Sequence, residues 1–169
     1  GGKLGYLIFN EDTVMKKLFK YLGISLASLL LITAIGLYIF YSMYKNWEGF
    51  VNASERNDIS QMQEILNQGF DINQTLMQVS PLFVAVSYSH INYETIKFML
   101  DNGADVNAKS TRGFLPIHYA IFEKRPDIVK LFLEYGTDVS YKIKEKTLLD
   151  IAVISNNQEI IDIIKQYQK

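Results

Sequence analysis

The feature of this sequence that most constrains its fold is a phrase that returns three times at an almost constant interval. Its clearest copy, Asp101 to Ala108, reads Asp-Asn-Gly-Ala-Asp-Val-Asn-Ala, and weaker copies surround Gly69 and Gly136. The glycines of the three copies, Gly69, Gly103 and Gly136, lie 34 and 33 residues apart. A fixed period of this length indicates a row of repeated units, each of which buries its apolar side against its neighbours.

A second motif accompanies the glycine phrase in the segments Ser80–Ala85, Leu115–Ala120 and Thr147–Ala152. A Ser or Thr hydroxyl in this motif caps a helix, a proline is tolerated in the first turn, and leucine and alanine face the neighbouring unit. Together the two motifs resemble the ankyrin repeat, whose first helix opens with the pattern T-P-L-H-x-A. The resemblance covers about residues 47–169.

The resemblance implies an all-α protein, an ankyrin-repeat solenoid of about four helix-turn-helix units. We expect the units at about residues 46–73, 78–107, 113–140 and 145–169 of a domain that spans residues 46–169. The spacing between the two helices is two residues longer in the second unit, so we place an insertion at about residues 89–93. Gly103 follows a helix end and is expected in the left-handed conformation, which glycine adopts without steric cost.

An apolar run of 24 residues, 21–44, carries no charged side chain. As a helix it would be about 36 Å long, enough to cross a hydrocarbon core roughly 30 Å thick. We therefore expect a single transmembrane helix over residues 21–45, after an N-terminal tail of residues 1–20. A cleaved signal peptide is the alternative, but the run is long and lacks a clean small-residue cleavage site. Met15 would be the natural start, which would make residues 1–14 non-native.

The charges beside the apolar run predict its orientation. Lys16, Lys17 and Lys20 precede it, whereas Lys45 stands alone after it until Arg56. The positive-inside rule then leaves the N-terminus in the cytoplasm and the repeats on the extracytoplasmic side, the periplasm in a bacterium. Two small residues four positions apart, Gly23 and Ala27, could pair two such helices, so a weak homo-oligomer is an open alternative.

Few residues suggest chemistry. The chain has no cysteine and only two histidines, His90 and His118, neither of which has a second histidine at metal-binding spacing. We expect no enzyme, no cofactor and no metal. The ankyrin resemblance gives His118 a structural role, a hydrogen bond to backbone between repeats. The net charge of −1 argues weakly against a nucleic-acid partner.

In the ankyrin family, loops between units form fingers and the first helices line a concave groove, and this surface usually binds the partner. The corresponding fingers here are residues 74–79, 109–114 and 141–146, of which the later two are basic. Aromatic residues also occupy groove positions where the family prefers small or polar ones. We therefore predict partner contacts by Tyr88, Lys109, Arg112, Phe114, Tyr119, Phe122, Tyr141, Lys142 and Lys144. The alternatives are solvated turn residues for the basic set and local core filling for the aromatic set.

The ankyrin resemblance implies a non-enzymatic module that binds another protein. With one membrane span, this layout is similar to immunity proteins that neutralise secreted antibacterial toxins and to accessory proteins of periplasmic enzymes. The expected function is to bind, and to modulate or neutralise, a protein partner beside the membrane. The alternatives are a structural or assembly protein that oligomerises through its membrane helix, and a hydrolase or transferase with an unrecognised site.

Overall fold

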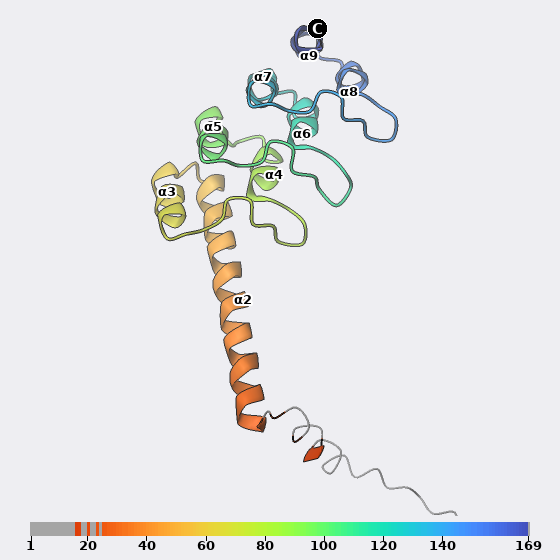
Figure 1. Cartoon of the computed structure of the whole chain (residues 1–169). Helices are drawn as coiled ribbons and strands as arrows, with labels where there is room; N and C mark the ends of the chain where they lie inside the picture. Colours follow the sequence, from red (N-terminus) through yellow and green to blue (C-terminus); the bar gives the residue numbers. More distant parts are fainter. Residues whose placement is uncertain (1–15, 18–19, 21–22, 24, 169) are drawn as a thin grey trace, which may run out of the picture. The chain divides into compact units, whose positions relative to one another are not determined.

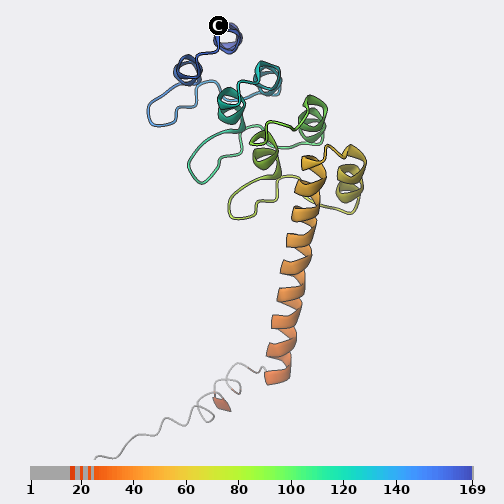
Figure 2. The same ribbon diagram turned by 180° about the vertical axis from the view of Figure 1, so that it is seen from behind.

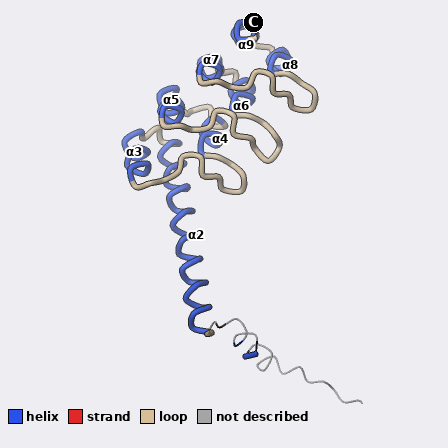
Figure 3. The backbone as a smooth tube through the Cα atoms, viewed as in Figure 1, coloured by secondary structure: helices blue, strands red, loops and turns tan. Residues whose placement is uncertain are grey.

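In a computed structural model of the chain, the described residues are 16–17, 20, 23 and 25–168. The predicted tail and the first residues of the apolar run lie mostly outside them. The helices are α2 (Leu26–Glu55), α3 (Ile59–Asn67), α4 (Pro81–Val86), α5 (Tyr93–Asp101), α6 (Pro116–Phe122), α7 (Pro126–Glu134), α8 (Leu148–Ser155) and α9 (Gln158–Tyr167) (Figure 1). The described residues form no extended strand, so the predicted all-α class is confirmed (Figure 3).

The chain divides into two compact units, residues 1–43 and residues 44–169. In the first unit the apolar run is helical from Leu26, and its large apolar side chains are exposed. Among the described residues, α2 is the one helix long and apolar enough to cross a membrane. Its residues 26–45 would rise about 30 Å, the thickness of a hydrocarbon core. This helix is a candidate membrane span.

The structure corrects the expected pairing motif in the apolar run. Gly23 lies in a turn before α2 with a φ of 63°, whereas Ala27 is inside the helix. Small residues pack two helices only when they share one helical face. Gly23 and Ala27 therefore do not form the predicted helix-pairing face.

In the second unit, helices alternate between two rows. Helices α4, α6 and α8 form one row and α3, α5, α7 and α9 the other, as both views show (Figures 1 and 2). The C-terminal residues of α2 supply the first helix of the first repeat, where Phe50 and Ala53 are fully buried. From α4 onwards, successive helices within each row contact one another, and one apolar core runs from Phe50 to Ile164. Each repeat is thus stabilised mainly by its neighbours.

The repeated glycine phrase forms the turn that ends each second helix. Gly103 has a φ of 84°, and its N–H donates to the Leu100 carbonyl at 3.0 Å. The next N–H, from Ala104, reaches back to the Met99 carbonyl, also at 3.0 Å. This pair of bonds is a Schellman motif, which satisfies the last carbonyls of the helix. The left-handed conformation predicted for Gly103 is confirmed.

Two asparagines downstream of these glycines connect neighbouring repeats. The Asn73 amide donates to the Gly103 carbonyl at 2.9 Å and accepts from the Asp105 N–H at 2.8 Å. Asn107 repeats the arrangement one unit later, with Gly136 at 3.0 Å and the Asp138 N–H at 2.9 Å. Each amide therefore uses both its donor and its acceptor to hold the following turn in register.

The extra residues of the second repeat lie between its two helices, as predicted. Six residues separate α4 from α5, against three between α6 and α7. Ile91, inside this longer turn, is almost fully buried in the common core. The insertion therefore contributes to packing and is not a purely solvated loop.

The first helices begin in two different ways. Ser80 and Thr147 cap α4 and α8 through their hydroxyls, as the motif predicts. At α6 the cap residue is Leu115, which has no hydroxyl, and the Leu115 N–H donates to Nδ1 of His118 at 2.9 Å. His118 thus hydrogen-bonds to Leu115 in its own repeat, and not between repeats as the family resemblance implied.

Candidate partner-binding surface

The predicted fingers are short loops on the side of the α4, α6 and α8 row (Figure 1). In the first finger, the backbones of Leu76 and Val79 pair through two hydrogen bonds of 3.0 Å. Met77 and Gln78 between them have φ values of 51° and 62°. Two consecutive positive φ angles are typical of a type I′ turn, whose twist matches a hairpin. The third finger repeats this turn at Lys144.

An aromatic cluster lies where the second finger meets α6. It consists of Phe114, Tyr119 and Phe122, whose ring centroids are 5.9 to 6.2 Å apart in edge-to-face arrangements. Phe83 of α4 joins it through Tyr119 at 4.7 Å. Phe114 and Tyr119 are half-buried, but Phe122 remains 46% exposed. The cluster therefore holds its rings in fixed orientations while leaving aromatic area accessible.

A second set of contacts joins the second and third fingers. The Tyr141 hydroxyl donates to the Gly113 carbonyl at 2.7 Å. The Lys109 ammonium lies 4.7 Å from the centroid of the Tyr141 ring, close enough for a cation–π interaction. Gly113 has a φ of 78°, and a Cβ there would lie only 3.3 Å from the Tyr141 hydroxyl. Tyr141 and Lys109 are thus positioned by the fingers themselves.

Comparison with known proteins decides which family has this architecture. A family model described as ankyrin repeats, in three copies, matches residues 50–143, more than half of the chain.

The chain belongs to the ankyrin-repeat family.

Its relatives come from distant organisms. It is 33% identical to a putative ankyrin repeat protein of fowlpox virus over 66% of this chain and 35% of that protein. It is 30% identical to one of Borreliella burgdorferi over 62% of this chain and 45% of that protein. It is 29% identical to human transient receptor potential cation channel subfamily A member 1, over 74% of this chain and 11% of the channel. The chain thus spans less than half the length of each of these relatives.

Family membership confirms the ankyrin resemblance and the predicted fold, and it indicates a general role. Ankyrin repeats are protein–protein interaction modules, and proteins built from them are generally not enzymes. None of the three relatives carries a name that denotes an enzyme. Within the described part of the chain, no three His, Cys, Asp or Glu side chains are grouped to hold a metal ion.

Five of the nine predicted contact residues form one connected region, because the centroid of the His118 ring lies 5.6 Å from that of Phe114 and 6.2 Å from that of Tyr141. They are the three rings of the aromatic cluster and the Lys109–Tyr141 pair. Arg112, Lys142 and Lys144 are exposed on the same two fingers, and none of them forms an ion pair with another described residue.

The lysines of the third finger also influence a neighbouring carboxylate at the start of α8. Hydrogen bonds from Thr147 lower the pKa of Asp150, and the positive charges of Lys146 and Lys142 contribute to this shift.

Tyr88 lies apart from that region, in the long turn between α4 and α5. Its ring centroid is 5.6 Å from that of His90. A hydrogen bond to the Glu55 carboxylate raises the pKa of the Tyr88 phenol. The structure therefore separates Tyr88 from the other aromatic candidates and places it beside the first repeat.

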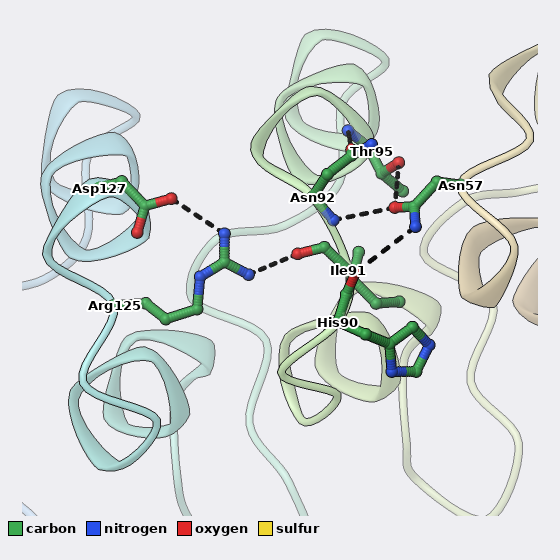
Figure 4. A network of polar contacts seen from close by, with 7 residues as sticks. All are labelled: Asn57, His90, Ile91, Asn92, Thr95, Arg125 and Asp127. Carbon is green, nitrogen blue, oxygen red and sulfur yellow. Dashed lines mark hydrogen bonds and ion pairs between the residues drawn. The ribbon is translucent and has the colours of Figure 1, made fainter.

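The same turn carries a polar network that sequence reasoning missed (Figure 4). The Asn57 amide oxygen accepts from the Asn92 N–H at 2.9 Å and from the Thr95 hydroxyl at 2.8 Å. From the next repeat, Arg125 donates to the Ile91 carbonyl at 2.5 Å and pairs with Asp127 at 2.9 Å. These side chains link three repeats. In the sequence, the feature that could have indicated this network is Asn57, an isolated asparagine between two expected helices.

Sequence reasoning also missed apolar side chains that the fold leaves exposed. Met77 at the tip of the first finger is 86% exposed, and Val153 and Ile154 of α8 are exposed as well. An apolar residue between turn residues was the only signal for Met77. Nothing in the periodicity distinguishes Val153 from its buried counterparts in earlier repeats.

Proposed function

We propose that this protein is a membrane-anchored ankyrin module that binds a protein partner through the aromatic cluster and the two basic fingers. The observation that carries the proposal is the exposure of Phe122 beside Phe114 and Tyr119, which are already fixed in place. Rigid aromatic rings supply binding energy at low entropic cost, because little side-chain freedom remains to be lost.

The charges around the cluster define the chemistry of that partner. Lys109, Arg112, Lys142 and Lys144 lie exposed on the second and third fingers, in a domain where acidic residues are otherwise more numerous. A partner with an apolar centre and an acidic rim would complement this surface. Long-range attraction would also speed its association at low salt.

The membrane side and the narrower role extend this proposal. The lysines before the apolar run favour a cytoplasmic N-terminus and an extracytoplasmic ankyrin domain. On that side the domain would modulate or neutralise its partner, as an immunity protein does for a toxin or an accessory protein for an enzyme.

A binding experiment tests the surface. A photo-crosslinking residue at position 122 identifies the partner in cells, and the affinity of the purified pair is then measured by calorimetry. Because exposed aromatic residues at interfaces are often worth about 2 kcal/mol, Phe122→Ala should weaken binding by about 30-fold. Lys130→Ala, at an exposed residue of α7 in the other row of helices, is the control and should bind as the unaltered chain does. Equal affinities for both variants would exclude the aromatic cluster as the contact surface.

A labelling experiment tests the orientation. Because the chain has no cysteine, single cysteines at Lys17 and Lys144 can be labelled with a membrane-impermeant maleimide without background. Lys144→Cys should react in intact cells, whereas Lys17→Cys should react only after lysis. The reverse pattern would place the ankyrin domain in the cytoplasm, and the partner would have to be sought there.

A further inference from the structure

A cavity lies between the C-terminal part of α2 and α3, two helices that are side by side in both views (Figures 1 and 2). The residues that line it include Lys45 and Gly49 of α2 and Gln61, Glu64, Ile65 and Gln68 of α3. Its volume is about 230 Å³. Sites for drug-sized ligands have roughly 300 to 1,000 Å³, so this cavity suits a smaller polar group.

The wall of the cavity carries one cation and one anion that are not paired with each other. The Lys45 ammonium and the Glu64 carboxylate both line it, and neither belongs to an ion pair among the described residues. On α5, by contrast, Lys97 and Asp101 pair directly at 2.6 Å. A ligand that carries both charges would therefore complement this cavity, with its anion at Lys45 and its cation at Glu64.

The position of Lys45 in the chain indicates where such a ligand comes from. Lys45 is the first charged residue after the apolar run of residues 21–44, and Tyr44 and Trp47 flank it. Basic and aromatic residues at the end of a span lie at the level of the lipid headgroups. The inference thus rests on the proposed membrane anchor, which brings phospholipid headgroups to this cavity.

The two charges also follow the order of the groups in a phosphoethanolamine headgroup. A Cβ on Gly49 would lie 3.6 Å from Cδ1 of Ile65, so Ile65 and the preceding Glu64 are beside Gly49. Gly49 is four residues beyond Lys45, or about 6 Å farther from the apolar run along the helix. In the headgroup, the phosphate is joined to the glycerol and the ammonium is at the outer end. The phosphate therefore corresponds to Lys45 and the ammonium to Glu64.

We propose that this cavity binds the headgroup of a phospholipid with a primary ammonium, such as phosphatidylethanolamine. Lys45 donates to the phosphate, and the Glu64 carboxylate accepts from the ammonium. Phosphatidylcholine has no N–H to donate to Glu64, and phosphatidylglycerol has no cation, so both bind less tightly. The site is separate from the proposed partner surface, because it uses none of the nine finger and groove residues.

Native mass spectrometry of the full chain in detergent, titrated with each of these lipids in its dioleoyl form, tests the site. The unaltered chain should bind phosphatidylethanolamine about fivefold more tightly than the other lipids, since exposed ion pairs contribute up to about that factor. Glu64→Gln should abolish this preference and leave the binding of phosphatidylglycerol unchanged. An unaltered chain without a headgroup preference, or a Glu64→Gln variant that keeps it, overturns the proposal. Soluble phosphoethanolamine that binds as tightly as the lipid would exclude the lipid as the ligand.

A cavity-filling variant tests the location. Gly49→Leu places a side chain in the cavity, and it should abolish the preference for phosphatidylethanolamine. Leucine favours a helix more than glycine does, so the variant should fold, which circular dichroism checks. Gly36→Leu is the matched control in the same helix, where a Cβ would meet no atom within 4 Å, and it should bind as the unaltered chain does. Equal lipid preferences in both variants would contradict binding in this cavity.

The headgroup site and the membrane anchor fail in different experiments. Release of the unaltered chain from membranes by an alkaline wash would refute the anchor, and with it the lipid as the ligand. A chain that stays in washed membranes but shows no headgroup preference in detergent would refute the site alone. The lipid titration and the membrane wash therefore separate the two proposals.

Discussion

At the scale of single residues, His118 shows how one side chain substitutes for a missing cap. Ser80 and Thr147 cap their helices through hydroxyls, whereas Leu115 cannot. His118 accepts the Leu115 N–H through Nδ1, and its Nε2 is buried without a hydrogen-bond partner among the described residues. Burial lowers the pKa of His118, because the charged form would lose its solvation. The imidazole is therefore held neutral in the folded protein.

This burial predicts an acid-sensitive component of stability. The unfolded chain protonates His118 near pH 6.5, whereas the folded chain does so only at lower pH. The unfolded state then binds more protons, so the free energy of unfolding falls as pH drops from 6.5 towards the folded pKa. One proton accounts for a slope of at most about 1.4 kcal/mol per pH unit.

Urea denaturation between pH 7 and pH 5 measures this slope. His118→Asn keeps an acceptor but does not titrate, so it should flatten the dependence in that window. His90→Asn is the control for replacing a histidine by asparagine, and it should retain the slope because it leaves His118 in place. An unchanged slope in His118→Asn would assign the acid sensitivity to other groups.

At the scale of elements, the fingers combine favourable hairpin geometry with unfavourable residues. Met77, Gln78, Lys144 and Glu145 all have positive φ angles, and none of them is glycine or asparagine. Each such residue costs about 1 kcal/mol relative to one that tolerates the left-handed region. The two turns therefore lower the free energy of unfolding, and they carry exposed side chains at their tips.

Replacing Met77 and Gln78 by Asn and Gly should raise the free energy of unfolding by about 1 to 2 kcal/mol, since this pair suits a type I′ turn. Thermal unfolding measures the change. As a control, Asn and Gly in place of Thr111 and Arg112, whose φ angles are not positive, should not raise the free energy of unfolding. If both double variants behave alike, turn strain is not the cause.

The asparagine links between repeats predict a second effect at this scale. Asn73→Ala and Asn107→Ala should each lower the free energy of unfolding by about 1 kcal/mol, since a backbone donor and acceptor lose their partner and water replaces it incompletely. Ser140 lies at the same distance after Gly136, but its backbone N–H and its hydroxyl both donate to Asp138 in its own turn. Chemical denaturation should show a smaller loss for Ser140→Ala. Equal losses would contradict a role in joining repeats.

At the scale of the whole molecule, the chain combines a candidate membrane span with a stack whose repeats depend on one another. In α2 the exposed side chains from Leu26 to Met43 are overwhelmingly apolar, which is typical of a helix that faces lipid. In the stack, burial comes from successive repeats. The exposed apolar surface of α2 is therefore what supports the proposed membrane anchor.

Membrane fractionation tests this division. The unaltered chain should stay with membranes after an alkaline wash. Leu30→Arg together with Leu37→Arg should release it, because each arginine near the centre of a span costs about 2.5 to 3.5 kcal/mol of insertion free energy. Met77→Arg is the control and should remain bound. Release of the unaltered chain by the wash would exclude an integral membrane anchor.

The features that the sequence predicted correctly are those that depend on local chemistry. Gly103 was predicted to be left-handed because few other residues accept that conformation, and the insertion near Ile91 followed from counting residues. The position of the second and third fingers could be inferred in the same way. Their exact contacts, such as Tyr141 with the Gly113 carbonyl, could not, because they join residues 28 positions apart.

The sequence by itself determined the period, the helices and the family, since these follow from turn chemistry and apolar spacing within single repeats. Only the tertiary structure decided which apolar residues are covered. Val153 and Ile121 occupy equivalent places in their repeats, yet one is exposed and the other buried. Burial in a stack depends on the presence of a neighbour on each side, and no residue encodes that within its own repeat.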